Sequence, residues 1–181
     1  MKSKFTPKDS ATATLVANTQ CRDSFTFHNP VEVKCYDKDG NLKWEEMNYN
    51  VCTDEGLTAM LNYTFHATTQ IATWYVGLAG TGTKAVANTA ASHAAWAEVS
   101  AYSGTRPAWV ETLAATKSIS NTGNLASFAI NGDATVAGAG IWSDTSGTAG
   151  VLFAVVDFAS PRTVANGDTL TVLYTITCAD S

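Results

Sequence analysis

The sequence from Asn166 to Thr177 is NGDTLTVLYTIT, and this stretch decides the fold class. Four apolar residues occupy alternate positions in it: Leu170, Val172, Tyr174 and Ile176. A period of two predicts a strand with one buried face and one open face. The Asn166-Gly167 pair just before it favours the positive φ angles of a tight hairpin turn. The stretch therefore predicts an antiparallel strand whose open face carries Thr171 and Thr175, which become candidate interface positions.

The same pattern recurs along most of the chain. Further strands are expected in the ranges 71–78, 116–119, 125–130, 135–142 and 151–158. The side chains of the segment 135–142 are unusually small, and Gly138 and Gly140 have none. Another backbone or a large side chain should therefore come close to this segment. This spacing of strands predicts a mainly β protein, an antiparallel β-sandwich or jelly roll formed by residues 30–181.

Two local elements precede the main run of strands. A hairpin is expected over 31–47, with a plain turn at 37–41 rather than a calcium loop, because no bidentate carboxylate occupies the twelfth position of that loop. One short helix is expected near 54–65, capped by Thr53. Its apolar face is expected to consist of Leu57, Met60, Leu61 and Phe65.

Residues 1–29 have the composition of an extended N-terminal arm. Polar side chains interrupt every apolar run, and only Leu15-Val16 and Phe25-Thr26-Phe27 offer surface to bury. Such a segment becomes ordered when a partner binds it, so Phe25 and Phe27 are candidate interface positions. The start is basic but lacks the apolar stretch of a signal peptide, which predicts a protein made and used without export.

Charged residues make up only 15% of the chain, and the net charge is −5. Residues 51–181 carry four basic and nine acidic side chains, which accounts for the whole of that charge. Without a basic patch, we expect no direct contact with nucleic acid and none with an anionic membrane. A neutral, threonine-rich surface is easy to desolvate, which favours a protein in contact with neighbours. An ordinary β protein with a threonine-rich open face is the alternative.

Motifs for chemistry are scarce. Cys21, Cys35, Cys52 and Cys178 show no metal-binding spacing, so we expect free thiols, no metal and no cofactor. The segment Gly80–Lys84 lacks the spacing of a phosphate-binding loop. Glu98 and Glu111 are the carboxylates left without an evident structural role, and they are a weak basis for a hydrolase. We therefore expect no enzyme.

Several segments taken in order resemble a family of small structural proteins of tailed bacteriophages. The segments are Trp74-Tyr75-Val76-Gly77-Leu78, Ser92-His93-Ala94-Ala95-Trp96-Ala97-Glu98, Tyr102, Thr105-Arg106-Pro107-Ala108-Trp109, Phe158-Ala159-Ser160-Pro161-Arg162 and Val164 through Asn166-Gly167-Asp168-Thr169-Leu170. The hairpin with Gly40-Asn41-Leu42, followed by Val51 and Glu55-Gly56-Leu57, is similar to the same family. The resemblance covers residues 31–178 and leaves the arm unmatched.

The resemblance implies a non-enzymatic virion protein, most simply a capsid decoration or cement protein that binds across major capsid protein subunits as a dimer or trimer. Its place would be the capsid surface, after assembly in the host cytoplasm. Arg106, Pro107 and Trp109 carry over only as fold or interface positions. The arm would lie as a strap across a capsid subunit, and its removal (residues 1–29) should leave a folded domain that no longer coats capsids. The alternative is a tail or fibre component that binds host-surface glycan through exposed Trp and Tyr rings.

Overall fold

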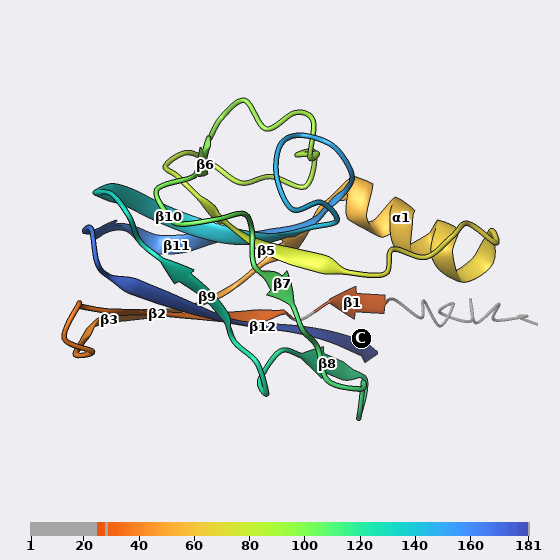
Figure 1. The fold of residues 1–181 in the computed structure, drawn as a ribbon. Coiled ribbons are helices and arrows are strands. Elements are labelled where there is room, and N and C mark those ends of the chain that lie inside the picture. Colours follow the sequence, from red (N-terminus) through yellow and green to blue (C-terminus); the bar gives the residue numbers. More distant parts are fainter. Residues whose placement is uncertain (1–24, 28, 181) are drawn as a thin grey trace, which may run out of the picture.

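The computed structural model describes residues 25–27 and 29–180, which form two antiparallel sheets packed face to face (Figure 1). The β12 sheet comprises β1 (Phe25–Phe27), β2 (Pro30–Tyr36), β3 (Leu42–Tyr49), β8 (Ser118–Ser120), β9 (Ala126–Ala129) and β12 (Thr169–Asp180). The β10 sheet comprises β4 (Val51–Cys52), β5 (Trp74–Ala79), β6 (Glu98–Val99), β7 (Ala108–Trp109), β10 (Ala134–Trp142) and β11 (Leu152–Val164). The expected β-sandwich is confirmed.

Strand β12 organises its sheet because four other strands pair with it. Along one edge it pairs with β2 over 169–174 and with β1 over 178–180. Along the other edge it pairs with β9 over 169–172 and with β8 over 175–177. Leu170, Val172 and Tyr174 are fully buried, as their alternation predicts. Their side chains face the β10 sheet and form the centre of the core.

The turn before β12 is tight, but it does not form the expected hairpin. Gly167 has a φ of 93°, and the Asp168 amide donates to the Ala165 carbonyl at 3.0 Å. The strands that this turn joins, β11 and β12, belong to different sheets. The chain therefore crosses the sandwich here, because β12 finds its hydrogen-bonding partners among β2 and β9 instead.

The hairpin expected over 31–47 is confirmed as β2 and β3, paired from Pro30↔Tyr49 to Tyr36↔Leu42. Its turn is closed by the Asp37 side chain, whose Oδ1 accepts hydrogen bonds from the amides of Asp39 and Asn41. The β2–β3 hairpin forms one edge of the β12 sheet. It leaves the other face of β2 and β3 open to solvent.

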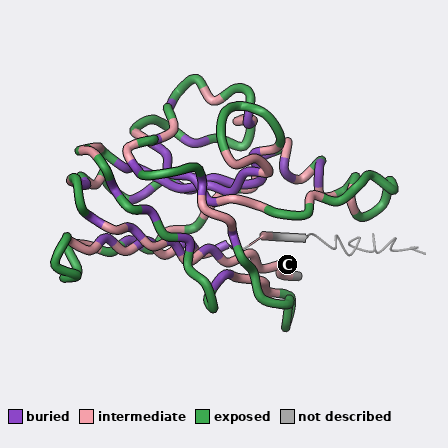
Figure 2. Tube along the Cα trace, viewed as in Figure 1, coloured by how far each residue is buried: buried purple, intermediate pink, exposed green. Residues whose placement is uncertain are grey.

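The single helix of the described residues, α1 (Asp54–Phe65), has the expected position and cap, with Thr53 Oγ1 accepting from the Gly56 amide. The expected apolar face is correct only in part: Leu57 and Met60 are half-buried and Met60 packs against the core, but Leu61 and Phe65 do not pack. Gly56 and Ala59 are the buried residues, whereas Leu61 is 53% and Phe65 81% exposed. The part of α1 that projects farthest from the sandwich is mostly exposed (Figure 2). A Cβ at Gly56 would lie 2.2 Å from the Phe153 carbonyl oxygen. The helix therefore packs through its small residues, where its backbone can approach β11 closely.

Close packing also explains the small residues of β10, the central strand of the β10 sheet. A Cβ at Gly138 would lie 2.2 Å from the Val156 carbonyl oxygen, and one at Gly140 would lie 2.8 Å from the Trp142 ring. The expectation of a close approach is thus confirmed. Strand β11 is longer than expected because it resumes pairing with β10 at Arg162, after an irregular stretch that contains Pro161.

Candidate interaction surfaces

The solvent side of the β12 sheet is the first candidate surface. We call it the threonine face and define it by Glu32, Lys34, Tyr36, Glu45, Met47, Ser127, Thr171, Leu173 and Thr175. The cross-strand register places Thr171 between Lys34 and Ser127, and Leu173 opposite Glu32. These residues alternate with the buried residues of the same strands, so they lie on the side away from the core.

The threonines of this face are half-buried rather than open. Long side chains from β2 stand beside them, and a groove of ≈220 Å³ lies along Thr171 and Leu173, bounded by Tyr36 and Leu125. The sequence predicts that the threonines alternate with core residues, but it does not predict that they are half-buried. It does not show which strand lies next to β12 and covers them with its side chains. The lining of the groove also includes Thr122 and the charged pair Glu32 and Lys34.

The charges on the threonine face compensate one another. Lys34 forms an ion pair with Glu32 on its own strand, and Glu45 is its register partner on β3. The hydrogen bond to Glu32 and the carboxylate's charge raise the pKa of Lys34 above its ordinary value. The face thus combines a small number of paired charges with neutral polar groups.

Arg106 is not on the surface: it is 2% exposed and holds two loops together. Its Nε and Nη2 donate to the two carboxylate oxygens of Glu98 at 2.6 and 2.5 Å. Nη1 and Nη2 also donate to the carbonyls of Asp144 and Gly147 at 2.8 and 2.7 Å. Arg106 therefore fixes the loop between β10 and β11 onto β6, and Glu98 is occupied by this ion pair.

Pro107 and Trp109 likewise serve the fold. The Pro107 carbonyl accepts from the Val76 amide at 2.9 Å, which holds the start of β7 beside β5. Trp109 is 4% exposed, and its Nε1 donates to the Tyr174 carbonyl at 3.1 Å across the sandwich. Trp109 is thus held in the core by its indole nitrogen, and Pro107 is half-buried.

The end of the expected arm belongs to the β12 sheet. Phe25–Phe27 form β1, in register with 178–180 of β12. The Phe27 ring meets the Phe153 ring edge-on, at 6.2 Å between centroids. Residues 1–24, which include Leu15, Val16 and Cys21, lie outside the described residues, and so does His28.

An apolar pocket of ≈190 Å³ opens beside β1, at the end of the sandwich where α1 projects (Figure 1). Its walls come from both sheets and the helix: Met60, Tyr63, Thr64, Gln70, Trp74, Trp109, Ile141, Phe153 and Ile176. Trp74 and Phe153 meet edge-on at 5.6 Å between centroids. We call this the end pocket.

The buried charged groups of the described residues are each paired with an opposite charge. Lys84, in the glycine-rich loop, has a side chain that is 1% exposed. Its Nζ donates to the carbonyls of Gly80 and Gly82 at 2.6 and 2.9 Å, and lies 2.9 Å from Asp157 Oδ1. All three donors of the amine are used, so this loop does not offer it to a phosphate.

Asp168 shows the same pattern. Burial opposes its ionisation, but hydrogen bonds from Lys43 and the Ala165 amide outweigh it, and the pKa of Asp168 is lowered. Burial raises the pKa of the Cys52 thiol to about 11, so it is not a nucleophile at neutral pH. Cys35, Cys52 and Cys178 are free thiols.

Within residues 25–27 and 29–180, no group of three His, Cys, Asp or Glu side chains lies close enough to hold a metal ion. The helix of that part of the chain is not long and apolar enough to cross a membrane.

Two structurally important residues escape the sequence analysis. Lys84 carries no signal beyond its place in a glycine-rich loop. Asn121, fully buried, donates from Nδ2 to the Val172 carbonyl at 3.0 Å and accepts at Oδ1 from the Tyr174 amide at 2.7 Å. It fills the space between β8 and β9 along β12, and a lone Asn in a polar stretch gives no hint of this role.

Comparison with known proteins adds no relative: no protein-family model matches the sequence, and no curated protein matches it.

Proposed function

We propose that the protein is a non-enzymatic structural protein of a bacteriophage virion, which decorates the capsid and stabilises it by binding across major capsid protein subunits. It assembles in the host cytoplasm and acts on the capsid surface as a homo-oligomer, without a cofactor. The observation that carries this proposal is the threonine face, and the ordered set of segments that resemble phage structural proteins supports it.

The threonine face suits a broad protein contact. Its hydroxyl groups cost far less to desolvate than ammonium or carboxylate groups, and the Lys34–Glu32 pair is already neutralised. Methyl groups of Thr171 and Thr175 and the side chain of Leu173 supply apolar area. A weak contact of this kind is sufficient on a shell, because linked copies bind many times over one lattice.

The test is binding to purified capsids that lack decoration. The double variant Thr171→Glu/Thr175→Glu places two carboxylates on the threonine face, where Lys34, the register neighbour of Thr171, is already paired with Glu32. The control Ser146→Glu adds a charge to the exposed loop between β10 and β11. Co-sedimentation measures binding, and circular dichroism checks the fold.

Wild-type protein and the Ser146→Glu control should saturate the capsids, whereas the double variant should bind at least about tenfold more weakly, since each buried uncompensated charge costs more than 1.4 kcal/mol. If wild-type protein does not bind capsids, the proposed function is wrong. If the folded double variant binds as tightly as the wild type, the contact lies on another surface.

The alternative, a tail or fibre component that binds host-surface glycan, has less support. Sugar rings stack on exposed aromatic rings, yet Trp96, Trp109 and Trp142 are buried and Trp44 and Trp74 are half-buried. Tyr49 and Phe65 are exposed at 62% and 81%, but they lie on different elements, β3 and α1. A signal on a glycan array together with no binding to capsids would favour this alternative.

A further inference from the structure

We infer that the end pocket receives Leu15 and Val16 from the arm of a second copy of this chain, so that the protein assembles by exchanging its N-terminal arms. This inference concerns self-association and does not depend on binding to capsids. It rests on three features: the chemistry of the pocket, the direction in which β1 leaves the sheet, and the sequence of the 24 residues that precede β1.

The end pocket is large and apolar enough to take a branched aliphatic side chain. A cavity of about 150 Å³ with apolar walls binds a benzene molecule, and the end pocket measures ≈190 Å³. Trp74, Phe153 and Ile176 line it, and they come from β5, β11 and β12. Water molecules interact only weakly with apolar walls, so an apolar side chain that displaces them is bound favourably.

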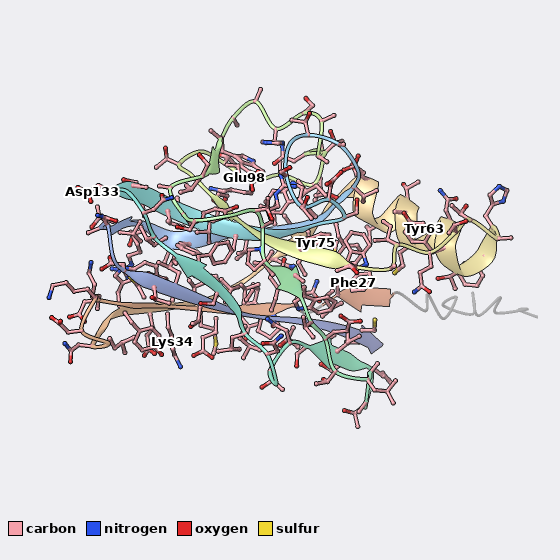
Figure 3. The ribbon with its side chains drawn as sticks, in the orientation of Figure 1. Phe27, Lys34, Tyr63, Tyr75, Glu98 and Asp133 are labelled. Atoms are coloured by element: carbon pink, nitrogen blue, oxygen red, sulfur yellow. The ribbon has the colours of Figure 1, made fainter. Side chains whose placement is uncertain are left out.

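Strand β1, which follows the arm in the sequence, lies beside this pocket. Phe27 contacts Phe153, which is itself part of the pocket wall. Figure 3 shows Phe27 and Tyr63, another lining residue, at the same end of the sandwich. The only adjacent pair of large aliphatic side chains in residues 1–24 is Leu15-Val16. The nine residues from Val16 to Phe25 span up to about 30 Å when extended.

The direction of β1 favours a second copy over the same chain. Phe27 lies in register with Cys178 and Phe25 with Asp180, so the backbone of β1, followed toward its N-terminal end, runs away from Ile176 and the pocket. To fill its own pocket, the arm would have to reverse. Two copies that meet end to end need no reversal, because each presents its pocket where the other's arm emerges. Such an exchange is isologous and closes after two chains.

The exposed apolar residues of α1 add to this surface. Leu61 and Phe65 are 53% and 81% exposed, and α1 projects from the same end of the molecule as β1 (Figure 1). They point away from Gly56 and Ala59, the residues that pack on the sandwich. In an end-to-end pair these side chains would be covered together with the pocket, which extends the apolar contact.

The test combines oligomeric state with a crosslink. Sedimentation velocity would compare the wild type with Leu15→Asp/Val16→Asp and with the control Ala11→Asp/Thr12→Asp, which adds equal charge to the same arm. A photoreactive residue replacing Tyr63 would report what occupies the pocket. Mixing ¹⁵N-labelled and unlabelled chains would show whether the crosslink joins two chains or one.

Wild type and control should self-associate, Leu15→Asp/Val16→Asp should associate at least about tenfold more weakly, and crosslinks should join position 63 of one chain to residues 12–18 of another. The inference is overturned by a monomeric wild type, by unchanged association of the Leu15→Asp/Val16→Asp variant, or by crosslinks within one chain only. Capsid binding by a monomeric wild type would overturn this inference and the homo-oligomeric part of the proposed function, while leaving the proposed decoration of the capsid intact.

Discussion

Asn121 shows how a single side chain can complete a sheet. Between the residues of β12 that pair with β9 and those that pair with β8, the backbone would lack a partner. The Asn121 amide takes both roles of a neighbouring strand, as donor to Val172 and acceptor from Tyr174. A carboxamide has the same donor and acceptor geometry as a peptide group, which explains why Asn occupies this place.

Replacing Asn121 with Ala should lower the free energy of unfolding by about 2–4 kcal/mol, because a buried N–H and a buried carbonyl lose their partners. Asn124→Ala, at an exposed position in the same turn, is the control and should change it by less than about 0.5 kcal/mol. Urea unfolding followed by tryptophan fluorescence measures both. Equal stability of the two variants would show that another group satisfies β12.

At this scale the sequence predicts burial better than it predicts partners. The alternation in β12 identifies Leu170, Val172 and Tyr174 as core residues because a strand must direct alternate side chains to opposite sides. Arg106 and Lys84 are different, because their roles depend on which carbonyls the folded loops bring to them. No local pattern encodes Asp144 and Gly147 as partners of Arg106, since the loop that carries them follows it by more than thirty residues.

Glycine residues allow neighbouring elements to pack at short distances from one another. Helix α1 and strand β10 both approach β11 so closely that a methyl group at Gly56 or Gly138 would collide with a β11 carbonyl. Residues 54–65 were predicted as a helix because propensity and capping are local. The apolar face was misjudged because hydrophobicity alone favours Leu61 and Phe65, whereas the size of Gly56 decides which face can dock.

Gly138→Ala should destabilise the protein by about 1–3 kcal/mol, since the new methyl group overpacks a backbone that cannot yield freely. Gly123→Ala is the matched control: its Cβ would meet only a side-chain methyl of Thr112, at 3.7 Å. For a chain of this size the expected loss in Tm is roughly 2–4 °C per kcal/mol. A Gly138→Ala protein that melts with the Gly123→Ala control would refute the close approach.

For the whole molecule, the described fold includes Phe25–Phe27 and Asn29, which the sequence assigns to the arm. Phe27 packs on Phe153, and Asn29 is 1% exposed. Asn29 donates from Nδ2 to Cys52 Sγ at 3.3 Å, and its Oδ1 accepts from the Thr177 amide at 3.0 Å. These contacts tie the first residues of the fold to both sheets, so a truncation at residue 29 removes part of the core.

Deleting residues 1–29 should therefore lower the free energy of unfolding by about 2–5 kcal/mol relative to deleting residues 1–24, from the loss of Phe27 burial and of the Asn29 hydrogen bonds. Both truncations lack the arm, so self-association through it affects neither. Differential scanning calorimetry at matched concentrations gives the comparison. Identical melting curves would mean that β1 and Asn29 contribute nothing to the fold.

The sandwich as a whole follows from the sequence, but the assignment of strands to sheets does not. Of the twelve strands in the described residues, seven are longer than three residues. The composition that predicts each of these strands is a local property of the sequence. Strands β11 and β12 belong to different sheets although a short turn joins them. This separation depends on which strand edges are free to pair when the chain collapses. The threonine face was predicted on the correct strand for the same local reason, and the end pocket was not, because it forms where three distant elements meet.

The position of β12 among four partner strands also determines how the molecule carries mechanical load. Its hydrogen bonds to β1, β2, β8 and β9 lie across the strand direction. Tension applied along β12 from its C-terminal end is therefore shared by four ladders in shear, and they must rupture together. Tension applied perpendicular to β3, at the sheet's edge, would instead open its hydrogen bonds to β2 one after another. A shell under internal pressure would be reinforced most effectively by a subunit attached through the strand that bears shear.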